Sequence, residues 1–250
     1  MDRYKEKNYI VKSNIQVARK TWRILLEGDT SDFTAPGQFV NIRVSGRYLR
    51  RPISVSNYDA TTLTLLYDVV GAGTQEISYL KTGDKVNLLT GLGNGFDITV
   101  SGERPVLLGG GIGVAPMVNL AFALRSIGKT PVILLGFATG DDVSLVTEMR
   151  EAGFETYVST VDGSVGTKGF VTDALKENVS DFDYFYACGP MPMLKAICNT
   201  LPQPGQLSLE ARMACGFGVC MCCSTETTEG PKRICKDGPI FTKEELSNKL

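Results

Sequence analysis

The sequence predicts an antiparallel β-barrel followed by a parallel α/β sheet, with a small cysteine-rich segment at the C-terminal end. In about the first hundred residues, short strand-like runs recur between Gly, Pro and Asp turns, which is typical of a small barrel. Beyond residue 101, strands alternate with helices, which indicates an α/β sheet. Five of the seven cysteines lie between Cys215 and Cys235. We therefore expect three domains, at residues 1–100, 101–204 and 205–250.

The barrel half is predicted from runs of β-branched and aromatic residues. Turn signals separate these runs, as at Ala35–Gln38 and Lys81–Asp84. One short helix, Thr74–Leu80, interrupts the pattern. The expected strands are Tyr9–Val11, Trp22–Leu26, Phe39–Val44, Ile53–Val55, Leu63–Tyr67 and Lys85–Leu89.

The second half alternates short apolar runs with helical stretches, as a doubly wound parallel sheet does. The C-terminal segment has little helical periodicity until Thr242–Lys249. The expected strands are Pro105–Leu108, Pro131–Gly136, Glu155–Ser159 and Tyr184–Ala187. The expected helices are Ala115–Ile127, Val143–Glu151, Val171–Asn178 and Pro192–Thr200.

Charge and composition exclude several classes of function. The 250 residues carry 26 basic and 27 acidic side chains, so no bulk charge favours nucleic acid. No apolar run approaches the ~20 residues that span a bilayer, and the charged N-terminus lacks a signal-peptide core. We expect a cytoplasmic protein that binds neither nucleic acid nor membrane. The absence of histidine excludes Ser-His and Cys-His catalysis, Rieske ligation and imidazole zinc sites.

The cysteine cluster is the strongest motif. Cys215, Cys220 and Cys223 form C-x4-C-x2-C with a distal fourth cysteine, Cys235. This is the spacing of plant-type [2Fe–2S] ligation. A zinc knuckle and a loop of inert thiols are the alternatives, although zinc sites more often pair two compact halves. The spacing therefore predicts an iron–sulfur cluster.

The residues between these cysteines refine the prediction. Gly216 and Gly218 allow the backbone to wrap closely and aim N–H groups at sulfur. Cys222 competes with Cys223 for the third ligand position. The two-residue spacing from Cys220 favours Cys223.

Two motifs on the barrel indicate a flavin dinucleotide. Arg51 in the run Arg51–Ser54 has a guanidinium suited to a phosphate, and Ser54 is placed to hydrogen-bond a flavin edge. Gly73 and Thr74 open a short helix whose N–H groups suit a pyrophosphate. The alternative for Arg51–Ser54 is an ordinary strand start with an edge proline. Together, the two motifs favour the flavin site.

A glycine-rich turn follows the first strand of the second half. Gly110, Gly111 and Gly113 lie where a doubly wound sheet binds phosphate, and Pro116 replaces the last glycine of the usual pattern. Proline is tolerated in the first turn of a helix. The turn Cys188-Gly189-Pro190 lies at the same predicted edge of the sheet. The alternative is a connection without a ligand.

The choice between NAD and NADP rests on the loop after the second strand of the sheet. Gly136–Asp142 contains Asp141 and Asp142 and no lysine or arginine. A 2′-phosphate needs a cation there, so the loop favours NAD.

These motifs together resemble the ferredoxin–NADP reductase superfamily. The cysteine segment narrows the resemblance to the electron-transfer subunits of NAD-linked (B-type) dihydroorotate dehydrogenases. It covers essentially the whole chain and is most specific at Glu210–Cys220 and Cys235–Phe241.

The resemblance implies three cofactors and a partner. It implies a [2Fe–2S] cluster on Cys215, Cys220, Cys223 and Cys235, with NAD as co-substrate. An FMN-containing catalytic subunit oxidises dihydroorotate in such a heterotetramer, for pyrimidine biosynthesis, and electrons pass from FMN through the cluster and FAD to NAD⁺. The implied FAD contacts are Arg51, Pro52, Ile53, Ser54, Leu66, Tyr67, Asp68, Gly73 and Thr74.

The chain departs from the family pattern in two places. Asp68 stands where relatives usually carry a basic residue, which predicts a weaker phosphate contact, and the segment between Cys223 and Cys235 is short. Two other functions fit the same motifs. One is a reductase subunit of a sulfide dehydrogenase, hydrogenase or bifurcating transhydrogenase, and the other is a non-catalytic redox sensor. Hydride transfer needs no protein acid or base, so no catalytic residue is expected.

Overall fold

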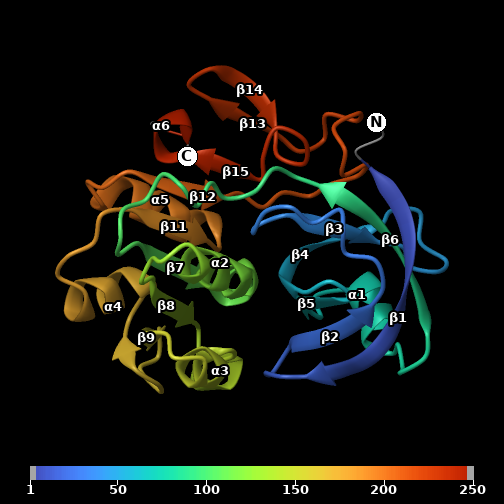
Figure 1. The fold of residues 1–250 in the computed structure, drawn as a ribbon, viewed down its shortest axis with the longest axis horizontal. Helices are drawn as coiled ribbons and strands as arrows, with labels where there is room; N and C mark the ends of the chain where they lie inside the picture. The colour runs from blue at the N-terminus through green and yellow to red at the C-terminus, as the bar shows by residue number, and fades with distance from the viewer. Residues whose placement is uncertain (1–3, 247–250) are drawn as a thin grey trace.

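A closed antiparallel barrel lies beside a seven-stranded sheet in the computed structural model, which describes residues 4–246 (Figure 1). This confirms the predicted fold class. The barrel order is β1-β2-β5-β4-β3-β6, and a short helix, α1, follows β5. The bounds are β1 Lys5–Gln16, β2 Thr21–Glu27, β3 Phe39–Ile42, β4 Arg51–Tyr58, β5 Thr62–Asp68, α1 Ala72–Ser78 and β6 Lys85–Leu92.

The barrel closes because alternate side chains point into one apolar core. In β5, Leu63, Leu65 and Tyr67 belong to this core. Helix α1 adds Ile77 to it, and the Asn14 side chain donates hydrogen bonds to the carbonyls of Ile77 (2.9 Å) and Leu80 (3.2 Å). These bonds hold the C-terminal end of α1 and the turn after it against β1, in addition to the bond that the Ile77 carbonyl accepts from the Leu80 N–H at 3.2 Å.

The second sheet has the order β10-β9-β8-β7-β11-β12-β15, with β15 alone antiparallel to its neighbour. Its strands are β7 Val106–Gly110, β8 Val132–Phe137, β9 Thr156–Thr160, β10 Thr167–Lys168, β11 Phe185–Cys188, β12 Gly205–Ser208 and β15 Ile240–Thr242. The helices are α2 Ala115–Ser126, α3 Val146–Glu151, α4 Val171–Asn178, α5 Met191–Thr200 and α6 Lys243–Leu246. Two 3-10 turns, Gly111–Val114 and Gly140–Asp142, follow β7 and β8.

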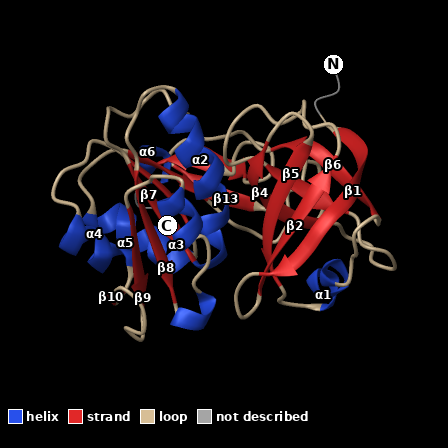
Figure 2. Cartoon of the chain, turned by 60° about the horizontal axis from the view of Figure 1, so that its bottom comes forward, coloured by secondary structure: helices blue, strands red, loops and turns tan. Residues whose placement is uncertain are grey.

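Helices cover both faces of this sheet (Figure 2). Val106 and Leu108 pack with α4 and α5 on one face, whereas Leu107 packs with α2 and α3 on the other. Because successive strand residues face opposite sides, a continuous apolar run serves two cores at once. The doubly wound arrangement is therefore confirmed.

The C-terminal segment joins the second sheet. β12 lies parallel to β11, and β15 returns antiparallel to β12. A hairpin of β13 (Ser224–Thr227) and β14 (Gly230–Arg233) fills most of the short stretch between Cys223 and Cys235. The predicted boundary after residue 204 stays a prediction, but the segment that follows it contributes two strands to the sheet.

Several element ends differ from the prediction. α1 begins two residues before Thr74, and α3 begins at Val146, because residues 140–142 form a 3-10 turn. A helix is expected over Thr242–Lys249. In the structure Thr242 ends β15 and Lys243–Leu246 form α6, while residues 247–249 lie outside the described part. Within residues 4–246 no helix has the length and apolarity needed to cross a bilayer.

Candidate functional site

A cleft of about 420 Å³ lies where the barrel, the second sheet and the C-terminal segment meet. Its walls come from β4, β5, the glycine-rich turn and the segment after β12. Eight of the nine residues expected to contact FAD line it, and the ninth, Gly73, adjoins it. The lining residues are Phe39, Arg51, Pro52, Ile53, Ser54, Leu66, Tyr67, Asp68, Val70, Thr74, Ile112, Ala115, Ser208, Leu209, Glu210, Ala211, Met213 and Pro239.

Arg51 lies against the start of α1. A Cβ atom on Gly73 would lie 2.0 Å from Arg51 Nε, so only glycine allows the guanidinium to approach this closely. The Thr74 hydroxyl accepts a hydrogen bond from the Val70 N–H at 3.0 Å. A cation and a helix start are thus adjacent at one wall of the cleft, which is a suitable arrangement for a phosphate.

The nearby residues Arg43 and Arg50 form contacts within the barrel instead. Arg43 and Arg50 pair with Glu6, at 3.9 and 3.1 Å, and the Arg50 guanidinium also donates to the Asn41 carbonyl at 3.3 Å. Of the arginines in this part of the sequence, Arg51 is the one that lines the cleft.

Asp68 does not present an unopposed negative charge. Lys20 Nζ lies 3.0 Å from Asp68 Oδ2, and the Thr21 hydroxyl donates to Asp68 Oδ1 at 2.7 Å. Lys20 therefore brings a cation next to the Asp68 carboxylate. The weaker phosphate contact expected from the sequence stays a prediction.

Glu210 is a cleft residue that motif reasoning did not select as a site. It lies two residues after the end of β12, and desolvation at the cleft wall, followed by repulsion from the nearby Asp68 carboxylate, raises the pKa of its carboxyl. Its position at the carboxyl end of a parallel strand was the available signal, since ligands bind at that edge of such sheets.

The two predicted nucleotide-binding turns pack against each other. A Cβ on Gly113 would lie 2.4 Å from the Cys188 carbonyl oxygen, and one on Gly110 would lie 2.3 Å from Met193 Sδ. Both turns follow adjacent strands, β7 and β11, from which the chain continues to opposite sides of the sheet. This is the topological switch point, where doubly wound sheets bind ligands.

The remaining turn residues occupy distinct positions. Gly111 has φ +55°, and Pro116 lies in the first turn of α2, as expected. Cys188 is buried at the end of β11, and burial raises the pKa of its thiol. Ile112 and Ala115 face the cleft, so the turn adjoins the wall formed by β4 and β5.

The structure corrects the interpretation of Asp142. Its carboxylate is buried and forms two hydrogen bonds with the Arg19 guanidinium, at 3.0 and 2.9 Å. It therefore contacts the barrel rather than an open nucleotide loop, and Arg19 supplies a cation from a distant part of the sequence. The sequence argument for NAD is that this loop contains no lysine or arginine; the fold brings Arg19 to it, where Asp142 engages the guanidinium, and Asp141 remains exposed.

The four predicted cluster cysteines lie as two neighbouring pairs. Cys215 contacts Cys220 side chain to side chain, and the Cys235 N–H donates to Cys223 Sγ at 3.4 Å. Among residues 4–246, no three His, Cys, Asp or Glu side chains are gathered as a ready-made metal site. The four thiols nevertheless share one short loop and the strand end beside it, and thiolate is the donor that iron–sulfur clusters take.

The loop backbone has the expected shape. Gly216 and Gly218 have φ of +80° and +90°. Burial raises the pKa of the Cys215 thiol, but the N–H groups of Cys220 and Phe217 outweigh this effect and lower it to about 6. The loop therefore directs N–H groups at sulfur and stabilises a thiolate.

Cys222 and Cys223 occupy different environments. The Cys222 thiol is exposed and lies 3.7 Å from the Arg212 carbonyl, to which it can donate. Cys223 is 3% exposed and adjoins Cys235. The geometry therefore favours Cys223 as the third ligand.

Asn41 in β3 links the cysteine loop to the cleft, and sequence reasoning missed it. Its buried side-chain amide donates to the Cys215 carbonyl at 3.3 Å, and a Cβ on Gly216 would lie 1.9 Å from Asn41 Nδ2. Asn41 is paired with Pro52 of β4 across the strand ladder. The available signal was a polar residue within the otherwise apolar run Phe39–Ile42.

Two family models match the chain. Residues 107–199 match the oxidoreductase NAD-binding domain. Residues 210–247 match the iron–sulfur cluster binding domain of dihydroorotate dehydrogenase B. The second match contains all four predicted cluster cysteines.

Curated relatives cover almost the full chain. A protein of Fusobacterium nucleatum subsp. nucleatum is 44% identical over 245 residues, covering 92% of this chain and 94% of the relative. One of Lysinibacillus sphaericus is 42% identical, covering 93% and 95%. Both are named dihydroorotate dehydrogenase B (NAD(+)), electron transfer subunit.

Solved structures share the fold. One chain, from work on an NADH-dependent reduced ferredoxin–NADP oxidoreductase and flavin-based electron bifurcation, has a TM-score of 0.86 at 30% identity, covering 97% of this chain and 92% of its own. A ferredoxin NADP⁺ reductase of Neisseria gonorrhoeae, solved with FAD and NADP, has a TM-score of 0.64 at 19% identity, with coverage of 76% and 88%. The latter shows a common fold.

Proposed function

Because the chain belongs to the family of electron-transfer subunits of NAD(+)-dependent dihydroorotate dehydrogenase B, we propose that it carries electrons from a dihydroorotate-oxidising subunit through a [2Fe–2S] cluster and FAD to NAD⁺. The observation that carries the proposal is the shared cleft. It joins the barrel motifs, the glycine-rich turn and the segment leading to the cysteine loop.

The barrel residues hold FAD in this proposal. Arg51 and the start of α1 take the phosphates, and Ser54 lies on the cleft wall where its hydroxyl can meet a polar ring edge. Leu66 and Pro52 form an apolar part of the cleft wall. When bound, FAD stores two electrons and exchanges them as a hydride with nicotinamide.

The sheet residues hold NAD. Gly110, Gly111 and Gly113 allow a phosphate to approach the backbone before α2, and Pro116 starts that helix without losing a needed N–H. The turn Cys188–Pro190 closes the other side of the switch point. With Ile112 and Ala115 facing the cleft, a nicotinamide bound here would reach the flavin wall.

Cys215, Cys220, Cys223 and Cys235 hold the cluster. Asn41 keeps their loop against β3, next to the strand that carries Arg51–Ser54. The chain thus places the ligand loop close to the flavin wall. Short separation favours electron transfer without any protein acid or base.

The partner supplies the substrate chemistry. The chain has no histidine, and the role proposed for it, passing electrons to NAD⁺, requires no base that deprotonates dihydroorotate. We propose a cytoplasmic heterotetramer with an FMN-containing catalytic subunit, acting in pyrimidine biosynthesis. The relatives' printed names support the division into subunits.

Anaerobic copurification with the product of a neighbouring gene tests this function. We expect flavin and cluster absorbance together with dihydroorotate-dependent NAD⁺ reduction. The same absorbance with NADH-dependent ferredoxin reduction instead would favour the relative that is 30% identical and would overturn the dihydroorotate assignment. A colourless complex would overturn the electron-transfer proposal itself.

Arg51 provides a direct test of the flavin site. Arg51→Ala is expected to weaken FAD binding by about 10- to 100-fold, because a hydrogen bond to a charged group contributes about 1.5–3 kcal/mol. Fluorescence titration of flavin-free protein measures the dissociation constant. Arg47→Ala, which changes an exposed arginine outside this cleft, is the control and should leave affinity unchanged. Equal effects of the two variants would contradict the assignment.

A further inference from the structure

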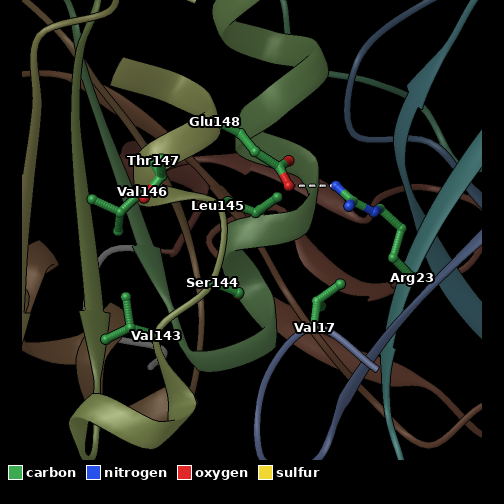
Figure 3. A pocket seen from close by; sticks show the side chains of 8 residues that line it. All are labelled: Val17, Arg23, Val143, Ser144, Leu145, Val146, Thr147 and Glu148. Carbon is green, nitrogen blue, oxygen red and sulfur yellow. Dashed lines mark hydrogen bonds and ion pairs between the residues drawn. The ribbon is translucent and has the colours of Figure 1, made fainter. Parts of the chain in front are cut away.

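A second contact between the two halves lies at the outer edge of their interface. A groove of about 200 Å³ separates the β1–β2 turn of the barrel from the loop that leads into α3. Figure 3 shows Arg23 of β2 reaching across it to Glu148 of α3, with Val17 on the barrel side and Val143–Thr147 on the other. The two halves therefore meet here through side chains.

Arg19 makes the closer connection. Its backbone N–H donates to the Asp141 carbonyl at 2.9 Å, and its guanidinium grips both oxygens of Asp142. The Asp142 side chain is only 9% exposed and also accepts a hydrogen bond from the Thr139 hydroxyl at 3.2 Å. A planar fork on a nearly buried carboxylate defines both distance and orientation. We call the pairs Arg19–Asp142 and Arg23–Glu148 the latch.

The loop on the sheet side is held in an uncommon conformation. Leu145, immediately before α3, has φ +68°, in the left-handed region that non-glycine residues seldom adopt, and its side chain is buried. Such a conformation persists only where the surroundings impose it. The latch contacts on both sides of Leu145, at Asp142 and Glu148, are part of those surroundings.

The position of the latch complements that of the interdomain linker. The chain between β6 and β7 crosses at one edge of the molecule, whereas β2 and α3 lie at the opposite edge (Figure 1). Between them, the Asn119 side chain of α2 donates to Asn57 Oδ1 of β4 at 3.1 Å. Phe39, Leu66 and Leu92 of the barrel also pack into the apolar cores of the sheet half. Apolar contacts are not directional, so the latch adds the contact that fixes orientation at the edge far from the linker.

Rotation of one half against the other would change the distance between the two walls of the cleft. Its barrel wall contains Arg51–Ser54, and its sheet wall contains Ile112 and Ala115. Reacting atoms in a productive complex lie about 3–3.5 Å apart, and a displacement of about 1 Å costs up to about 100-fold in rate. The rate of hydride transfer between two cofactors held by separate halves therefore depends on how accurately the halves are aligned.

We propose that Arg19 and Asp142, supported by Arg23 and Glu148, are positioning residues that align the nicotinamide-binding half with the flavin-binding half. The proposal rests on the proposed function, which assigns NAD and FAD to these halves. None of the four residues lines the cleft, so they act through alignment alone.

Rapid mixing of the FAD-loaded full chain with NADH under anaerobic conditions tests this role. In Arg19→Ala and Asp142→Asn, we expect the limiting rate of flavin reduction to fall about tenfold or more. The dissociation constant for NADH should change less than the rate, because the glycine-rich turn is untouched and only the neighbouring loop that contains Asp141 is loosened. The absorbance of the NADH–flavin charge-transfer complex should fall with the rate. The charge-swapped double variant R19D/D142R should recover part of it.

Arg104→Ala is the matched control. Arg104 pairs with Glu155 at 3.1 Å, but both residues belong to the sheet half and the pair is exposed. This variant loses an ion pair without touching the interface, so its reduction rate should equal that of the parent. A control rate reduced as much as that of Arg19→Ala would overturn the proposal, as would a parental rate in folded Arg19→Ala.

Hydrogen–deuterium exchange separates this proposal from the proposed function. Arg19→Ala should accelerate exchange at residues 140–151 and leave residues 210–235 unchanged. Failure of the parent protein to reduce flavin with NADH would refute the proposed function while this readout still tests the latch. Unchanged exchange at residues 140–151 would overturn the latch whatever the activity.

Discussion

Cys223→Ser is expected to leave the purified protein without its [2Fe–2S] cluster, whereas Cys222→Ser keeps it. Cys223 is buried and adjoins Cys235, while Cys222 is exposed and contacts the Arg212 carbonyl. A serine hydroxyl is a poor substitute for the soft thiolate that iron–sulfur clusters require. Iron and acid-labile sulfide per chain, with visible absorbance, measure the outcome after anaerobic purification.

Cys222→Ser is a strong control because it replaces the same atom, a sulfur by an oxygen, in the residue next to Cys223. Loss of iron in Cys222→Ser, with retention in Cys223→Ser, would show that the chain uses C-x4-C-x-C rather than the predicted C-x4-C-x2-C. Stoichiometric zinc in place of iron in the parent would instead support the zinc alternative. FAD content should stay the same in both variants, since neither cysteine lines the cleft.

Gly113→Ala is expected to have the second largest effect. The new methyl would lie 2.4 Å from the Cys188 carbonyl oxygen and 2.7 Å from Gly189 Cα, both backbone atoms that cannot rotate away. Overpacking of this kind costs about 1–3 kcal/mol and separates the two turns at the switch point. We expect NADH affinity to fall at least about tenfold, which corresponds to about 1.4 kcal/mol. Isothermal titration of NADH into flavin-free protein, which has no hydride acceptor, measures it.

Leu124→Ala tests whether that loss is specific. Leu124 is fully buried near the other end of α2, and truncating such a side chain costs about 2–5 kcal/mol of folding stability. We expect a lower melting temperature with unchanged NADH affinity. Were Leu124→Ala to lose affinity as much as Gly113→Ala, the turn would have no special role.

Local chemistry made much of this protein predictable. Alternating residues such as Leu63 and Leu65 mark strands of period two, and the glycines of Gly110–Gly113 permit the tight turn after a strand that other residues disfavour, with Gly111 at φ +55°. The cysteine spacing predicts the cluster ligands by itself, because the length of the loop limits which thiols can come together. These features depend on neighbours in sequence, so a single sequence predicts them.

Interactions between distant segments were not predictable in this way. The loop sequence around Asp141 and Asp142 contains no cation, yet Asp142 is paired with Arg19, which lies 123 positions away in the sequence. Asn41 and Cys215 are 174 positions apart, and nothing near either residue indicates the contact. Such pairs depend on how the barrel is placed against the sheet and the C-terminal segment.

The sequence by itself determined strands β1–β9 and β11, helices α1–α5, the glycine turns, the cysteine spacing and the family resemblance, whereas β10 and β12–β15 became evident only in the structure. Tertiary structure decided which charges are available to a ligand. It left Arg51 on the cleft wall while Arg50 pairs with Glu6, balanced Asp68 with Lys20, and placed Asp142 within the latch. The physical reason is that secondary structure depends on short-range periodicity and turn geometry, whereas the pairing of a charge depends on whichever side chain folding brings within a few ångströms of it.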